Sequence, residues 1–556
     1  MKQMNTPPFV KLCSLAFALT LLAGGRARAT DYYISPAGSD ANDGTAPNKA
    51  WQTIDRANKA TLRPGDRILF EGGRRFSGNL LIAASGTREA FLEIGSYGNG
   101  PATIQAGDSY AIRLLNCQYI KVGNLMLLGS GVKPNGETTN RAQGLDIYST
   151  ATEGNPWQSI YVDKLTVSGF RDGIVLHTPI GTQKVVGYND VRVTNCTIKE
   201  CLLGGFYCWG SERSSGKPWN FPLGAGLFAN CYLGGCTIYN IYGDPVGDPI
   251  LCLPIQIFNA TSFLVERCTI HHCGQAQNPK GSLGGVGGLV FLECAQSVAQ
   301  FNECHHIVTK LRYDGCAFDI DGGCTDCILQ YNYSHDNEGS GFQAGTFQGS
   351  SPTTGVTIRY NISENDVKKN PDNSGAIMTW AEVGKGQIYN NTVFISAGFD
   401  GKPAAFLGSG GGFTVRNNIF VVSHDGDIVY LKNPGGYKFQ NNCYYRAKGD
   451  FSVRSGEARF NSLSAWQTAT GQEKLKDVLL GFQVDPQFRT PGGAGTFDDA
   501  AKLGALNAYD LLQSSPVMDK GLDLQAMFGI APGPSDFRGA PLRTGGKYDL
   551  GAVDHK

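Results

Sequence analysis

The chain has 556 residues, with 48 basic and 48 acidic side chains and 74 glycines. The even charge balance, without basic clusters, argues against a nucleic-acid partner. Charged residues make up only 17% of the chain. Together with the many glycines, this favours packed β structure with tight turns over helix bundles or disorder.

The N-terminus has the pattern of a cleavable export signal. Lys2 and Lys11 precede an apolar run over residues 12–24, and Ala27-Arg28-Ala29 has the small-x-small form of a signal-peptidase site. The run is shorter than the ~20 residues of a membrane span. We therefore expect residues 1–29 to be removed and the mature protein to be secreted or periplasmic, with no membrane span.

Short segments that pair asparagine turns with alternating strands recur between residues 194 and 445. They are TNCTIKE from Thr194, YNYSHDN from Tyr331, RYNISEN from Arg359, YNNTVF from Tyr389, RNNIF from Arg416 and QNNCYY from Gln440. A recurrence of roughly 24 to 30 residues is the period at which one supersecondary unit stacks on the next. The repeats predict a coiled β solenoid.

The cysteines have two interpretations. Removal of Cys13 with the signal leaves 15, an odd number, so at least one thiol is expected to be unpaired within the chain. A group of cysteines and histidines suggests zinc: Cys268, His271, His272, Cys273, Cys304, His305 and His306. We favour small residues stacked at equivalent turns of neighbouring coils, because paired zinc-ligand spacings are missing.

Seven strands that begin after Gly or Ala can be aligned, from Gly144 to Ala376. Their second and fourth residues are mostly apolar and should face inward, so the alternating residues should form one outer surface. That surface carries Tyr148, His177, Tyr207, Trp209, Asp319, Asp321, Gln343 and Trp380. Aromatic rings beside carboxylates suit sugar rings, which stack on one face and offer hydroxyls to acceptors.

The two ends of the mature chain resemble those of secreted right-handed parallel β-helix proteins of the pectate-lyase-like superfamily. The resemblance rests on DYYISPAGSDANDGTAPNKAWQTIDRA from Asp31 and on DPQF, SSPVMDKG and KYDLGAVD near the C-terminus. It implies an all-β, right-handed parallel β-helix over residues 30–448, with an N-terminal cap. Residues 449–556 should form a helix, expected within residues 462–480, and an irregular strap packed on the β-helix. This superfold hosts several reactions and also non-enzymatic binders.

Asp319 and Asp321 are the best catalytic candidates. They are two residues apart on one strand, so both project from one face with Cα atoms ~6.6 Å apart. This spacing permits an inverting glycosidase and does not exclude a retaining one. Asp336 and Glu338, on the next coil, could supply a third carboxylate. Polygalacturonase-type signatures are missing, so a pectin-cleaving hydrolase is not supported.

Two other functions remain open. Carboxylate oxygens of Asp314, Asp319 and Asp321 would suit calcium. In a calcium-dependent polysaccharide lyase, Lys310 and Arg312 could help to neutralise a uronate carboxylate and take the proton from the neighbouring carbon. A non-catalytic glycan binder would need only the aromatic surface.

The favoured prediction is a monomeric glycosidase that acts on a polysaccharide and requires no cofactor, although calcium stays open. The substrate-binding residues would be His177, Tyr207, Trp209, Lys310, Arg312, His335, Gln343, Trp380 and Glu382.

Overall fold

The structure is a computed structural model that describes residues 29–182, 185–212, 227–247, 251–280, 285–311, 313–347, 349–369, 374–381, 383–399, 401–408, 410–543 and 548–555. The predicted signal peptide lies outside these residues, apart from Ala29. Within the described part of the chain, no helix combines the length and hydrophobicity of a bilayer span.

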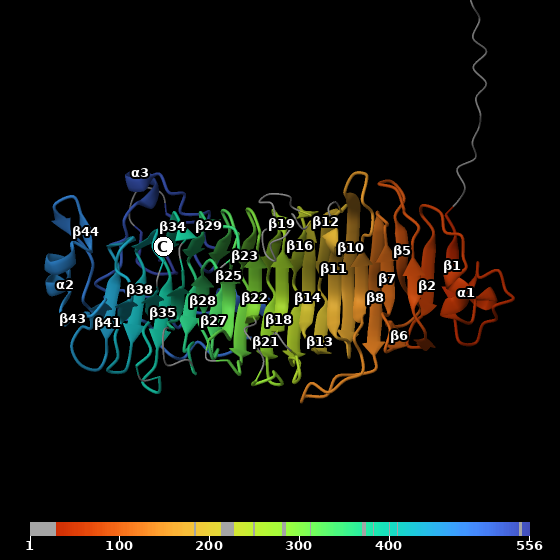
Figure 1. Cartoon of the computed structure of the whole chain (residues 1–556), viewed down its shortest axis with the longest axis horizontal. Helices are drawn as coiled ribbons and strands as arrows, with labels where there is room; N and C mark the ends of the chain where they lie inside the picture. Colours follow the sequence, from red (N-terminus) through yellow and green to blue (C-terminus); the bar gives the residue numbers. More distant parts are fainter. Residues whose placement is uncertain are drawn as a thin grey trace, which may run out of the picture.

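The chain forms a right-handed parallel β-helix, as predicted (Figure 1). Each coil contributes up to three strands, and equivalent strands of successive coils pair in parallel, so the strands stack into three rows. Rows 1 and 2 join into one 27-stranded sheet because β8 (Ile120–Gly129) and β10 (Trp157–Ser168) run through both rows.

Row 1 begins with β1 (Asp31–Ile34), which pairs with β2. Besides β8 and β10, the row contains β2 (Arg67–Glu71), β5 (Leu92–Tyr97), β12 (Tyr188–Thr194), β15 (Phe228–Ala229), β16 (Tyr232–Gly234), β19 (Ala260–Thr261), β20 (Leu264–Glu266), β23 (Val298–Gln300), β26 (Ile328–Gln330), β30 (Thr357–Arg359), β34 (Gly386–Tyr389), β37 (Phe413–Arg416) and β40 (Tyr437–Gln440).

Row 2 runs beside row 1 across a sharp turn in each coil. It contains β3 (Arg75–Ser77), β6 (Ala102–Gly107), β13 (Thr197–Cys201), β17 (Thr237–Ile241), β21 (Thr269–Cys273), β24 (Glu303–Ile307), β27 (Tyr333–His335), β31 (Ile362–Glu364), β35 (Thr392–Ile395), β38 (Ile419–Val422) and β41 (Cys443–Arg446).

Row 3 is a separate 14-stranded sheet that holds the strands aligned in the sequence. It contains β4 (Leu80–Ile82), β7 (Ile112–Leu115), β9 (Gln143–Tyr148), β11 (Asp172–Thr182), β14 (Gly204–Glu212), β18 (Leu251–Phe258), β22 (Gly285–Leu292), β25 (Cys316–Ile320), β28 (Phe342–Ala344), β32 (Ile377–Thr379), β36 (Ala405–Leu407), β39 (Val429–Leu431), β42 (Val453–Ser455) and β43 (Ala458–Phe460).

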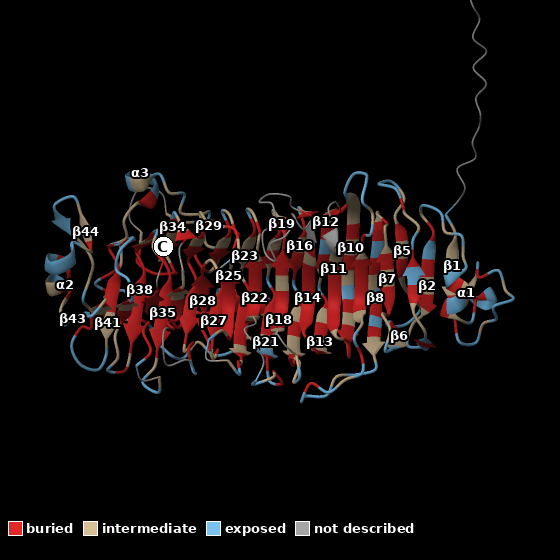
Figure 2. Cartoon of the chain, viewed as in Figure 1, coloured by how far each residue is buried: buried red, intermediate tan, exposed pale blue. Residues whose placement is uncertain are grey.

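Inward side chains of all three rows form one continuous apolar core. Figure 2 shows the buried positions running along the strands of the column, with exposed residues concentrated in the connections. The cysteines contribute to this core: all 15 in the described residues are buried free thiols. Hydrophobic burial of a continuous column therefore holds the coils together without disulfides.

A ladder of buried asparagines occupies the turn between rows 1 and 2. Each side-chain amide donates to the side-chain oxygen of the equivalent residue on the next coil. The ladder consists of Asn302, Asn332, Asn361, Asn391, Asn418 and Asn442, and the last amide donates to the carboxylate of Glu473. All but Asn302 belong to the repeating turns that predicted the solenoid, and their amides satisfy backbone groups at each turn.

The two ends of the column are covered differently. At the N-terminal end lie η1 (Pro47–Lys49) and α1 (Ile54–Asn58). At the other end, α2 spans Leu463–Thr470 and stops at Gly471, whose φ of 69° ends the helix in a left-handed cap. The expected helix is therefore shorter than residues 462–480, and β44 (Lys474–Leu475) pairs with β45 (Val478–Leu479) as a small hairpin instead.

Residues 481–555, the C-terminal strap, fold back along the column and include η2 (Ala500–Ala505) and α3 (Leu524–Phe528). The C-terminus lies beside β34 in Figure 1, and Asn390 donates to the carbonyl of Gly551. Apolar strap residues such as Tyr509 and Leu511 form a second core with outward residues of row 2. The strap thus covers row 2 and also reaches row 1, where Arg359 donates to the carbonyl of Ala531.

Candidate active site

The candidate site lies on the outer face of row 3, where strand alternation separates polar from apolar residues. Phe318 and Ile320 of β25 point into the core and are fully buried. Asp319 lies between Val290 and Gln343 of the neighbouring strands. Asp321 follows at the next outward position, so both aspartates face away from the core as expected.

Four carboxyl groups interact at this point of row 3. Asp314 precedes β25, Asp319 lies in it, Asp321 follows it, and Glu293 follows β22 on the preceding coil. Asp319 is only 6% exposed, whereas Asp314, Asp321 and Glu293 are half-buried. Asp314 and Glu293 have left-handed backbones, with φ of 63° and 51°, as many other residues between the strands of this chain do.

Burial and mutual repulsion set the protonation of the cluster. Burial raises the pKa of Asp321 to about 7. Burial and the charge of Asp321 raise the pKa of Asp314 to about 8, and the same two causes raise the pKa of Asp319 well above its usual range. Asp321 is therefore the first of these aspartates to ionise, and its neighbours retain their protons near neutral pH.

Two side chains from the following coils flank the aspartates. Gln343 donates from Nε2 to Asp319 Oδ2 at 2.8 Å. The indole of Trp380 covers Gly345, where an added Cβ would lie 2.3 Å from the ring. Gly345 continues the strand next to Asp321, because its N–H donates to the carbonyl of Ile320. The Trp380 ring therefore lies one strand beyond Asp321, in the same row of outward positions.

Two buried polar atoms at this site lack hydrogen-bond partners among the described residues. They are Asp319 Oδ1 and Trp380 Nε1. Unsatisfied buried groups are rare in folded proteins and need an explanation such as a functional role. A sugar hydroxyl could satisfy either atom.

An aromatic stack lies on the same face, several strands away. His177 of β11 stacks between Tyr148 and Trp209, with ring centroids 4.3 and 5.1 Å apart. Its Nε2 lies 2.7 Å from Asp146, which also accepts from Arg113. Trp209 lies on β14, three strands before β25, or ~14 Å from the aspartates. This stack shares the face with the cluster but does not touch it.

Tyr207 is outward-facing as predicted but is only 7% exposed. It packs with Val175, Leu253 and Val290 in a small apolar cluster, and its hydroxyl donates to the carbonyl of Leu203. The structure therefore gives Tyr207 a packing role rather than an open sugar-stacking surface.

Glu338 supports the loop before β25 instead of joining the cluster. Its Oε2 accepts from the N–H of Thr309 at 2.8 Å and pairs with Lys369. Lys310, in the same loop, has an exposed side chain, and its N–H donates to Gln277. Arg312 and Glu382 lie outside the described residues.

Asp336 and His335 lie in the turn and strand of row 2, away from the carboxyl cluster. Asp336 is hydrogen-bonded to His335 and forms an ion pair with Lys368. Burial alone would raise the pKa of Asp336, but these two partners hold it below its usual range. His335 is 1% exposed and also contacts Glu303. Strand β27 belongs to row 2, so the sequence proximity to Asp321 that suggested a shared site is misleading.

Calcium receives no support from the spacing of the acidic side chains. Among the described residues, two groups bring three ligand atoms within 4.8 Å of one another. Both contain histidines of row 2, and neither includes Asp314, Asp319 or Asp321. Calcium at the carboxyl cluster stays a prediction that chelation can test.

Sequence reasoning missed Glu293. Burial raises its pKa to about 7, and the charge of Asp321 adds to this effect despite hydrogen bonds from Ser351. Its position in the sequence, one residue beyond the aligned strand that ends at Leu292, could have identified it. The alignment stopped at the strand, whereas the left-handed turn aims this side chain back toward Gly323 of the next coil.

Comparison with known proteins is consistent with this architecture. No family model matches the chain. A lacto-N-biosidase of Bifidobacterium longum subsp. longum is 23% identical over 622 residues, which cover 94% of this chain and 36% of that protein. The chain thus spans about a third of the length of this curated relative.

Two solved structures share the fold. The GH136 lacto-N-biosidase from Eubacterium ramulus superimposes with a TM-score of 0.55 and 20% identity over 72% of this chain and 68% of that one. The complex of XylC with xylose gives a TM-score of 0.50 and 9% identity over 94% and 98% of the two chains. At these identities the likeness establishes a common fold.

Proposed function

We propose that this chain is a secreted glycoside hydrolase that cleaves oligosaccharides or polysaccharides at the carboxyl cluster of row 3. The observation that carries the proposal is the group of neighbouring carboxyl groups on the outer face of row 3, Asp314, Asp319 and Asp321, whose pKa values are raised by burial. Glycosidases need one protonated and one ionised carboxyl group on either side of the scissile bond.

Accessibility assigns the roles within the cluster. Asp314 and Asp321 are half-buried, so a substrate can reach both, whereas Asp319 is nearly enclosed and is held by Gln343. Asp314 would protonate the glycosidic oxygen. The Asp321 carboxylate would then attack the anomeric carbon or activate water, and Asp319 would hold Asp321 and the sugar in place. Trp380 offers a stacking surface one strand away.

The relatives support this class of reaction. The curated relative and one of the structural neighbours are both lacto-N-biosidases, so a lacto-N-bioside with a chromogenic leaving group is the first substrate to test. The lyase alternative depends on a positioned base, and Lys310 lies exposed on its loop. We therefore favour hydrolysis.

The test compares Asp321→Asn, Asp314→Asn and Asp319→Asn with the surface control Asp477→Asn, whose side chain is fully exposed. We expect kcat/KM to fall by ~10³ or more for Asp321→Asn and Asp314→Asn, and less for Asp319→Asn, because general acid catalysis alone contributes 10²–10⁴-fold. Asp477→Asn should behave as wild type. Circular dichroism checks that each variant is folded.

Two results would change the assignment. If Asp319→Asn is inactive while Asp314→Asn retains activity, the acid is Asp319, as the spacing of the two aspartates on one strand suggests. If unsaturated products form and disappear on calcium chelation, the protein is a lyase. NMR of the first-formed anomer decides between inversion and retention.

A further inference from the structure

Row 2 carries a column of stacked imidazoles beneath the C-terminal strap. His271, His305 and His335 occupy equivalent outward positions on β21, β24 and β27. The first two rings are 5.0 Å apart and nearly parallel, at 3°, and the next pair is 4.6 Å apart at 13°. Strand stacking therefore places imidazole nitrogens of neighbouring coils side by side.

Strand alternation separates these histidines from the cysteines next to them. Cys273 and Cys304 point into the core and are fully buried, whereas the histidines face the strap. The mixed cysteine and histidine zinc cluster suggested by the sequence is thus geometrically impossible. A site built from histidine and carboxylate remains.

His335 does not belong to that site. Its Nδ1 lies 2.9 Å from Asp336 and its Nε2 lies 3.3 Å from Glu303, so each ring nitrogen donates to a carboxylate. An imidazolium donates from both nitrogens and has no lone pair for a metal. The usable pair is therefore His271 and His305.

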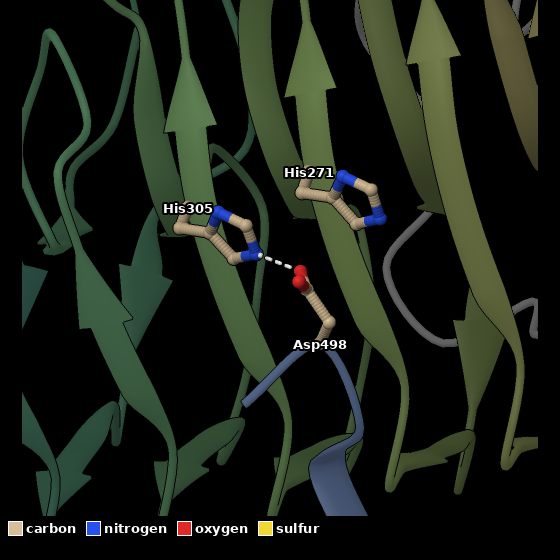
Figure 3. A group of neighbouring side chains, drawn as sticks. All are labelled: His271, His305 and Asp498. Atoms are coloured by element: carbon tan, nitrogen blue, oxygen red, sulfur yellow. Dashed lines mark hydrogen bonds and ion pairs between the residues drawn. The ribbon is translucent and has the colours of Figure 1, made fainter. Parts of the chain in front are cut away.

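Asp498 of the strap lies over this pair, as Figure 3 shows. Its Oδ1 is 3.1 Å from Nε2 of His305, and one ligand atom from each of the three residues lies within 4.8 Å of the others. Asp498 has a left-handed backbone, with φ of 51°, which aims its carboxylate at the column. The aspartate side chain is 64% exposed, so an ion can enter from solvent.

Neighbouring side chains orient both imidazoles. Nδ1 of His271 lies 2.8 Å from Nδ1 of His272, and the same distance joins His305 to His306. Each pair must share one proton. When His271 and His305 carry it on Nδ1, both Nε2 atoms present lone pairs, which is the arrangement of metal-bound histidine.

A fourth group points to the same place. Glu303 is fully buried, and one of its oxygens accepts from the N–H of Phe497 in the strap. Its other oxygen, Oε2, has no hydrogen-bond partner among the described residues. A carboxylate oxygen of Glu303 also lies within 4.8 Å of a ring nitrogen of His305. A buried, unsatisfied carboxylate oxygen of a residue beside the His305 imidazole is suited to a cation.

We propose that His271, His305 and Asp498 bind a zinc ion that fastens the C-terminal strap to row 2. Two imidazoles and a carboxylate are a common zinc ligand set, whereas calcium prefers oxygen ligands. Zinc bonds of about 2.0–2.2 Å place tetrahedral ligands ~3.4 Å apart, so the two rings, which are stacked 5.0 Å apart, need to lean together by about 1.6 Å at their ligand nitrogens. Water or Glu303 completes the coordination.

Such an ion would join segments far apart in the chain. Asp498 and His305 are separated by 193 residues. Nearby, hydrogen bonds from the N–H groups of Phe497 and Ala500 to side chains of row 2 already hold the strap. A ligand that binds only the docked strap stabilises the docked state in proportion to its occupancy.

The experiment uses the mature chain without a histidine tag, stripped by a chelator and dialysed against zinc. Bound zinc is measured by elemental analysis, affinity by competition with a chromogenic chelator, and strap docking by thermal unfolding and limited proteolysis. The variants are Asp498→Asn and His271→Gln, with Asp477→Asn as control. Asp498 is exposed, so Asp498→Asn should fold, which circular dichroism verifies.

We expect one zinc per chain in wild type and Asp477→Asn, with a higher midpoint of unfolding and slower cleavage of the strap when zinc is present. Affinity should fall at least tenfold in Asp498→Asn and in His271→Gln. Substoichiometric zinc in wild type would overturn the proposal. Equal binding by both ligand variants, or binding without any effect on unfolding or cleavage of the strap, would also overturn it.

Discussion

Asp321 is the carboxyl group to which the rest of the acidic cluster responds. Its charge contributes to the raised pKa values of Asp314, Asp319 and Glu293. Burial is the largest cause of each of these shifts, and the charge of Asp321 adds to it. Two chemically identical side chains, Asp314 and Asp321, can thus act as acid and base at the same pH because their surroundings differ.

The pH dependence of the reaction should reflect the different pKa values of Asp321 and Asp314. Activity needs Asp321 ionised, so kcat/KM should fall as pH drops below about 7, and it needs Asp314 protonated, so kcat/KM should fall again as pH rises above about 8. We expect a bell-shaped profile with its maximum between these values, measured as kcat/KM against pH. A maximum near pH 4, where unperturbed aspartates titrate, would contradict the assignment.

Asp314 and Asp321 change the stability of the fold with pH in the opposite direction to an ion-paired aspartate. Their pKa values are raised on folding, so their favourable contribution is present below the unfolded value of 3.8 and is lost as pH rises through about 7 to 8. Asp314 and Asp321 therefore lower the free energy of unfolding at alkaline pH. Such a sacrifice of stability is typical of functional sites.

Among the structural elements, the asparagine ladder is the one most sensitive to single substitutions. Asn361 is fully buried, accepts from the N–H and side chain of Asn332, and donates to Asn391 and to the carbonyl of Leu329. Asn361→Ala would leave several buried groups without partners, each at a cost of ~1–3 kcal/mol.

We expect Asn361→Ala to lower the free energy of unfolding by at least about 2 kcal/mol, measured by equilibrium denaturation in urea. The control is Asn507→Ala, at an exposed position in the strap, which should stay within about 0.5 kcal/mol of wild type. Similar stability of the two variants would show that the ladder contributes little.

The rows of the fold could be predicted because their signals are periodic. Asparagine turns recur once per coil, and alternation places Phe318 and Ile320 inside and Asp319 and Asp321 outside, as the structure confirms. The helix near residue 463 was predicted too long because the left-handed cap at Gly471 was not weighed against the apolar spacing that continues to Leu479.

The candidate site was harder to predict than the fold. Residues within one strand, such as Asp319 and Asp321, were placed correctly. Residues beyond a turn were not: Glu293 was missed, and His335 and Asp336 lie in row 2. A local pattern gives the direction of side chains along a strand, but which row follows a turn depends on the path of the whole coil.

On the scale of the whole molecule, all 15 described cysteines are free and buried, although the mature protein is expected to meet an oxidising compartment. Burial raises the pKa of thiols such as Cys117 to about 12, and enclosed neutral thiols are unreactive. We expect fewer than about one thiol per native chain to react with a chromogenic disulfide reagent, and all 15 to react in denaturant. Rapid reaction of many native thiols would contradict this packing.

The strap and the acidic cluster lie on different faces of the column. Strap residues bury the outward side chains of row 2, whereas the carboxyl cluster and the aromatic stack lie on row 3. Substrate binding and the proposed zinc site therefore use different faces. Loss of zinc should leave the geometry around Asp321 unchanged while loosening the opposite side of the coil.

The asparagine ladder also has a polarity. Every amide points its N–H group toward the C-terminal end, from Asn302 to Asn442, so the side-chain dipoles add head to tail and leave a partial positive charge at their last member. At that end of the ladder, the carboxylate of Glu473 accepts hydrogen bonds from Asn442 and Tyr444. The carboxylate thus acts toward the ladder as an acidic residue does toward the N-terminus of a helix. Whole coils could be inserted or removed ahead of Glu473 without reversing any bond, whereas a coil added beyond it would need a new terminal anion.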